Sequence, residues 1–104
     1  MRWWKHLYMG EHAGEKRAEV LRGIREKRMM PDTYVITLPE SGNHILDIRP
    51  VLLLTKEERE GQGPLILGVA SGMEEARELV RIMVDDMYKK TGEFDWNGYM
   101  SYLE

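Results

Sequence analysis

The segment between Leu65 and Gly92 constrains the fold of this chain more than any other part of the sequence. An apolar run, Leu65–Ala70, leads into a Ser-Gly turn and then into an amphipathic helix that stops at Gly92. Apolar side chains on both faces of the run predict a strand that is central in its sheet or covered on both sides. Ser71 and Glu74 have the spacing of a capping box, and Gly92 suits the left-handed residue after a helix. A strand followed by a capped helix predicts an α+β domain.

The rest of the chain supplies further elements of the same domain. Helical periodicity runs from about Ala13 to Met29 and ends before Pro31. The β-branched segment 33–38 and the segment 45–48 read as the two arms of a hairpin with a turn at 39–43, and Pro50 places the second arm at an edge or a break. The opening segment 3–9 fits either a helix or a strand, and a short helix follows Asp95.

We therefore predict one α+β domain over residues 1–104, in the order α-β-β-β-α with a short C-terminal helix. The expected sheet is antiparallel with three strands, or with four if the opening segment is a strand. The two main helices are expected to pack on one face of it. The charged segment 56–64 is expected to be a solvated loop and the most mobile part of the chain.

Composition excludes several classes of protein. Without cysteine the chain has no disulfide, thiolate metal site or cysteine nucleophile, and it fits a reducing compartment, so a cytoplasmic location is expected. No apolar run approaches the ~18 residues that cross a bilayer, so no membrane association is expected. The net charge of −3 argues against non-specific nucleic-acid binding, although residues 1–30 hold eight basic and four acidic side chains.

The motifs that would carry catalysis are missing. Ser71 opens a helix after a strand, but the nucleophile pattern G-x-S-x-G is absent, so an N-cap serine is the better interpretation. The same turn could hold an anion through its backbone N–H groups, but Glu74 and Glu75 would repel it. The histidines lack metal-site spacing. We therefore predict no catalytic residue, no metal and no cofactor.

The predicted element order is similar to that of double-stranded-RNA-binding domains. That family holds phosphates with a basic cluster at the start of its last helix, where this chain has Glu74, Glu75, Ala76 and Arg77. The charges have the wrong sign, so the resemblance stops at topology. The basic residues of the first helix alternate with glutamates, which favours a solvated surface over a nucleic-acid interface: they are Lys16, Arg17, Arg22, Arg25, Lys27 and Arg28.

A second resemblance covers nearly the whole chain. It rests on these segments: Trp3–Glu11, Tyr34–Leu38, Asn43 with Leu46–Ile48, Gly68–Gly72 with Glu75, Ala76, Leu79 and Val80, and Thr91–Asp95. With these motifs the chain resembles an uncharacterised family of small bacterial proteins. The resemblance implies a stand-alone domain of unknown function with no catalytic residues to transfer.

Two kinds of function remain after these exclusions. The first is a non-catalytic binding or self-association module, either a homodimer or a module for an unknown protein partner. Its expected interface is a set of aromatic residues in excess of what one thin core buries: Trp3, Trp4, Tyr8, Trp96, Tyr99 and Tyr102. The alternative is a small-ligand-binding protein or enzyme with a cleft near the N-terminal aromatics, formed by His6, His44, Asp47 and Arg49. A further alternative is nucleic-acid binding through the basic first helix.

Overall fold

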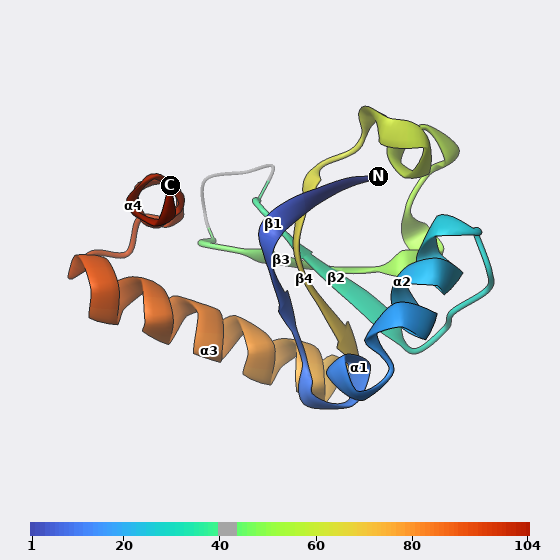
Figure 1. Cartoon of the computed structure of the whole chain (residues 1–104), viewed down its shortest axis with the longest axis horizontal. Coiled ribbons are helices and arrows are strands. Elements are labelled where there is room, and N and C mark those ends of the chain that lie inside the picture. Colours follow the sequence, from blue (N-terminus) through green and yellow to red (C-terminus); the bar gives the residue numbers. More distant parts are fainter. Residues whose placement is uncertain (40–43) are drawn as a thin grey trace.

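The computed structural model describes residues 1–39 and 44–104 and shows an α+β fold built on a mixed sheet (Figure 1). The elements in chain order are β1 (Arg2–Met9), α1 (Glu11–Glu15), α2 (Arg17–Arg25), β2 (Thr33–Thr37), β3 (Asp47–Pro50), two short helical turns η1 (Val51–Leu53) and η2 (Glu58–Gln62), β4 (Leu65–Ser71), α3 (Met73–Thr91) and α4 (Trp96–Leu103). Most of the hairpin turn predicted at 39–43 lies outside the described residues. No helix in the described ranges is long and apolar enough to cross a membrane.

The sheet has four strands in the order β1-β4-β2-β3. β1 runs parallel to β4, whereas β2 is antiparallel to both of its neighbours. The prediction of a purely antiparallel sheet is therefore wrong, and the ambiguous opening segment is the fourth strand. The long connection from β1 to β4 through α1, α2, β2 and β3 is what allows the two strands to pair in parallel.

The helices cover both faces of the sheet, so the prediction that the main helices share one face is wrong. On one face, α3 and α4 pack on a cluster that includes Leu67 and Ala70 of β4. On the other face, α1 and α2 pack on a cluster that includes Ile66 and Val69 of the same strand. The apolar residues on both sides of β4 require this arrangement, and they confirm that β4 is central.

The first predicted helix is divided and ends early. It breaks at Lys16, whose φ of −123° and ψ of 39° separate α1 from α2. It ends near Arg25, because Lys27 adopts a positive φ of 60° and the N–H groups of Arg28 and Lys27 donate to the carbonyls of Gly23 and Ile24. This is the hydrogen-bond pattern of a Schellman motif, which stops the helix before Pro31 is reached.

The segment between β3 and β4 is attached to the sheet. β3 is an edge strand, which is one of the two positions that Pro50 indicated, and it spans Asp47–Pro50 where the sequence predicted 45–48. Arg49 of β3 forms a two-pronged ion pair with Glu58, with N–O distances of 2.6 and 3.0 Å. The Arg49 guanidinium and the backbone N–H of Thr55 together lower the pKa of Glu58 to about 2. The segment predicted as a solvated loop therefore contains a helical turn fixed by this pair.

Candidate ligand-binding cleft

The carboxyl ends of β1 and β4 define the most distinctive place in the fold. The two strands are adjacent and parallel, but the chain leaves them in opposite directions (Figure 1). After β1 it turns at Gly10 into α1, on one face of the sheet, and after β4 it turns at Gly72 into α3, on the other. In open sheets, the crevice outside such a pair of strand ends is a preferred position for ligands.

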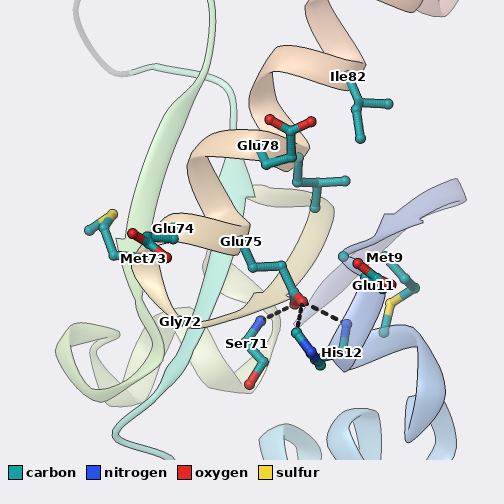
Figure 2. A pocket seen from close by; sticks show the side chains of 12 residues that line it. Met9, Glu11, His12, Ser71, Gly72, Met73, Glu74, Glu75, Glu78 and Ile82 are labelled. Carbon is teal, nitrogen blue, oxygen red and sulfur yellow. Dashed lines mark hydrogen bonds and ion pairs between the residues drawn. The ribbon is translucent and has the colours of Figure 1, made fainter.

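A cleft of about 660 Å³ lies at this position, between the start of α1 and the first turns of α3 (Figure 2). Its size is in the range of small-molecule sites. Its apolar lining comes from Met9, Met73, Leu79 and Ile82, and its polar lining is mainly acidic, from Glu11, Glu74, Glu75 and Glu78, with His12 and Ser71 beside them. The cleft therefore combines an apolar surface with several carboxylates.

Glu75 joins the two elements that form the cleft. Its carboxylate accepts hydrogen bonds from the backbone N–H groups of Ser71 at 2.5 Å, His12 at 2.6 Å and Ala13 at 3.2 Å. The imidazole Nδ1 of His12 lies 2.9 Å from the same carboxylate, as the dashed lines in Figure 2 show. Because His12 and Ala13 are in the first turn of α1, Glu75 supplies the acceptor that the free N–H groups of that turn need.

The same contacts decide the ionisation of Glu75, whose side chain is only 10% exposed. Partial burial raises the pKa of Glu75, but the hydrogen bonds donated by Ser71, His12 and Ala13 outweigh it, and its pKa lies below the usual value of 4.5. Glu75 is therefore a carboxylate held in its charged form by donors from two elements.

The start of α3 differs from the predicted capping box. The N-cap is Gly72, whose φ of 90° favours glycine, and no side chain caps the helix at that residue. The carboxylate that reaches back to Ser71 belongs to Glu75, one residue later than predicted. The other end of α3 is confirmed, because Gly92 is left-handed with a φ of 74°.

The other three carboxylates that line the cleft differ in their partners. Glu78 forms a two-pronged pair with Arg81 of the same helix, at 2.5 and 3.0 Å. The carboxylates of Glu11 and Glu74 are on exposed residues and make no hydrogen bond or ion pair within the described ranges. Across those ranges, no cluster of histidine and acidic side chains has the geometry to hold a metal ion.

The structure does not bring the four predicted cleft residues together. His6 is on β1 and Asp47 and Arg49 are on β3, which are the two edges of the sheet. Three strand spacings separate these edges, or about 14 Å. Arg49 pairs with Glu58, and His44 lines a smaller hollow together with Phe94, Asp95 and Trp96. The sequence pattern could not show this because it does not give the strand order.

Most of the aromatic residues predicted at an interface lie inside this chain. Trp4, Trp96 and Tyr99 are buried among α3, α4 and the sheet, with the two indole rings 5.8 Å apart at a steep angle. The Tyr8 hydroxyl donates to Asp86 at 2.7 Å and lies 3.0 Å from that of Tyr99. Burial and these hydrogen bonds raise the pKa of Tyr8 far above its usual value. Of the other two, Trp3 packs on the opposite face and Tyr102 is exposed.

The cleft residues were not predicted as a set, although each is visible in the sequence. Glycine follows β1 at Gly10 and serine and glycine follow β4 at Ser71 and Gly72, which are typical residues for chain reversals at strand ends. Only the parallel pairing of β1 with β4 shows that these reversals are neighbours. A scan of protein-family models, a search of curated proteins and a search of solved structures each found no match for this chain. Membership of a small bacterial family therefore stays a prediction.

Proposed function

We propose that this protein binds a small organic cation with an apolar body in the cleft between α1 and α3. One observation carries the proposal: a cleft of about 660 Å³ at the diverging ends of two parallel strands, lined by apolar and acidic side chains. Met9, Leu79 and Ile82 offer apolar contact to the body of a ligand. An ammonium group donates hydrogen bonds to these carboxylates and is also attracted by their charge. An alcohol donates one hydrogen bond but carries no charge, and an ionised acid is repelled.

The charge of the cleft favours this class of ligand over anions. Four glutamates line it, against one histidine and no lysine or arginine. Glu75 is already surrounded by donors, so Glu11 and Glu74 are the carboxylates left to attract a cation. A phosphate or carboxylate ligand would have to approach against these charges.

The proposed function is binding and not catalysis. His12 directs one ring nitrogen to Glu75, but within the described ranges no hydrogen bond joins its imidazole to the hydroxyl of Ser71. Nucleophilic catalysis by serine requires such a contact between nucleophile and base. Glu75 acts here as a structural acceptor for backbone N–H groups.

Hexylamine, hexanol and hexanoate test the proposal, because they share one alkyl chain and differ in charge. We expect hexylamine to shift the backbone amide resonances of residues 9–13 and 71–82 in a two-dimensional NMR titration, with an affinity of about 1 mM that is usual for a fragment. Hexanol is expected to bind more weakly and hexanoate not at all. Equal shifts for all three, or shifts spread over the whole surface, would contradict the proposal.

A pair of variants separates the local charge from the total charge. Glu11→Gln with Glu74→Gln removes the two unpaired carboxylates of the cleft and is expected to weaken hexylamine binding about two- to fivefold, the size of two exposed charge contacts. Glu57→Gln with Glu93→Gln removes the same charge from exposed positions that do not line the cleft. This control is expected to bind hexylamine as the unchanged protein does.

Self-association is a second candidate function, which one observation favours. The rings of Tyr88 and Phe94 stack 4.8 Å apart at the end of α3, yet remain 49% and 63% exposed. Exposed aromatic pairs are typical of the core of protein interfaces. We expect native mass spectrometry to show that the unchanged protein is a homodimer. The double variant Tyr88→Ser, Phe94→Ser is expected to be a monomer in the same measurement. A monomer of the unchanged chain at high concentration would remove this candidate and leave the cleft proposal intact.

A further inference from the structure

One face of α2 carries three arginines around a shallow hollow. Arg17, Arg22 and Arg25 line a space of about 380 Å³ together with Ala18 and Leu21. The hollow lies on the exposed side of the helix, outside the cleft between α1 and α3. The proposed cation-binding function does not use it.

The three arginines have no partner among the residues that the structure describes. The basic residues that follow them are paired, Lys27 with Glu60 at 3.1 Å and Arg28 with Glu26 at 2.6 Å. By contrast, no hydrogen bond or ion pair within residues 1–39 and 44–104 involves the guanidinium group of Arg17, Arg22 or Arg25. Three neighbouring guanidinium groups repel one another, and an anion placed between them would remove that repulsion.

Helical geometry separates these arginines from Glu19, the acidic residue of α2. At about 100° per residue, Arg17, Arg25 and Arg22 fall within one arc of roughly 140°, with Leu21 and Ala18 between them. Glu19 falls outside the arc by the same geometry, at roughly 200°, and it does not line the hollow. The sequence predicted basic residues that alternate with glutamates along this helix, but within α2 the three arginines share one face.

The length of this face fits an extended phosphate chain. Arg17 and Arg25 are eight residues apart on one helix. At a rise of about 1.5 Å per residue, they are separated by roughly 12 Å along the axis. Phosphates recur about every 3.4 Å of axis in one strand of a duplex and lie farther apart in an extended single strand, so about three of them can face this length. Guanidinium groups suit phosphate because they donate two parallel hydrogen bonds to it.

We propose that this face of α2 binds the phosphate backbone of a nucleic-acid strand without reading its sequence. The hollow is lined by no aromatic side chain on which a base could stack. The net charge of −3 of the whole chain keeps the interaction weak and limits it to the strongly basic N-terminal region. Three phosphate contacts predict a modest salt dependence.

Fluorescence anisotropy with a labelled single-stranded DNA of about 20 nucleotides and mixed sequence tests the proposal. For three contacts, the logarithm of the binding constant is expected to fall with the logarithm of salt concentration with a slope of about −2. The variant Arg17→Gln, Arg22→Gln, Arg25→Gln is expected to lose binding by about tenfold or more at low salt. A thermal melt by circular dichroism checks that this variant is folded.

A charge-matched variant shows whether the face or the total charge is responsible. Lys5→Gln, Arg77→Gln, Lys90→Gln removes three exposed basic residues outside α2 and is expected to keep most of the binding. Equal losses in both variants, or no binding by the unchanged protein at low salt, would overturn the proposal. Complete displacement of the DNA by pyrophosphate at equal phosphate concentration would also overturn it, because the hollow would then be a site for a small phosphate compound.

Discussion

Glu75→Ala is expected to lower the free energy of unfolding by about 2–4 kcal/mol, because backbone donors near the protein interior would lose a charged acceptor. Those donors are the N–H groups of Ser71, His12 and Ala13, which come from two different elements. Water can reach some of them after the substitution, so the loss is smaller than the sum of three charged hydrogen bonds. A domain of this size should lose about 10 °C or more of melting temperature.

Urea unfolding measures this difference, and Glu74→Ala is the matched control. Glu74 is the neighbouring acid in the first turn of α3, and its exposed carboxylate makes no hydrogen bond or ion pair within the described part of the chain. Its replacement is expected to change the stability by no more than about 0.5 kcal/mol. Equal effects of the two substitutions would show that Glu75 acts only through the helix dipole, which both acids share.

The stabilisation by Glu75 is expected to depend on pH with a definite sign. Its pKa in the folded protein lies below the usual 4.5, since the donated hydrogen bonds outweigh the effect of burial. The contribution is therefore complete above the unfolded pKa and is lost as the pH falls through the folded pKa. The stability difference between the unchanged protein and Glu75→Ala should be constant near neutral pH and shrink once the pH falls below about 4.5. A difference that grows on acidification would contradict the described hydrogen bonds.

The sequence alone predicted the structure correctly where the chemistry of one residue determines the local backbone conformation or hydrogen bonding. Pro50 lacks an N–H group, and β3 is an edge strand for that reason. Gly92 takes the left-handed conformation that ends α3. The apolar residues on both faces of Leu65–Ala70 correctly indicated a central strand. In each case the side chain or backbone chemistry of the residues limits the conformations and strand positions that their own segment can adopt.

Features that depend on pairing between distant segments could not be predicted from such local patterns. β1 fits a helix or a strand by its own pattern, and only the neighbouring β4 decides between them. The cleft follows from that pairing, because it brings Gly10 beside the start of α3. Counting aromatic residues likewise suggested an interface, whereas Trp4 and Trp96 meet each other in the core from opposite ends of the chain. The number of such side chains does not reveal where they meet.

Gly10→Ala is expected to destabilise the protein by about 2–3 kcal/mol through a contact that only the folded structure creates. The backbone of Gly10 has a φ of −65°, which any residue can adopt, so the effect does not come from its conformation. A Cβ atom at this position would lie 2.5 Å from Oε2 of Glu75 and 2.6 Å from its Cδ and Cγ. A free side chain would simply move away, but that of Glu75 is held by Ser71, His12 and Ala13. The methyl group therefore displaces the carboxylate and breaks those hydrogen bonds.

This mechanism predicts a strong coupling between the two positions. In the Glu75→Ala background the obstructing atoms are gone, so Gly10→Ala should cost no more than about 0.5 kcal/mol, and the coupling energy should be about 2 kcal/mol. Gly14→Ala is the control, since its Cβ would lie an ordinary 3.5 Å from that of Met9. It is expected to be neutral or to stabilise α1, because alanine is the better helix former. A double-mutant cycle by urea unfolding decides the matter: equal costs of Gly10→Ala in both backgrounds would mean that the methyl group acts on the backbone and that Glu75 is not the link between α1 and α3.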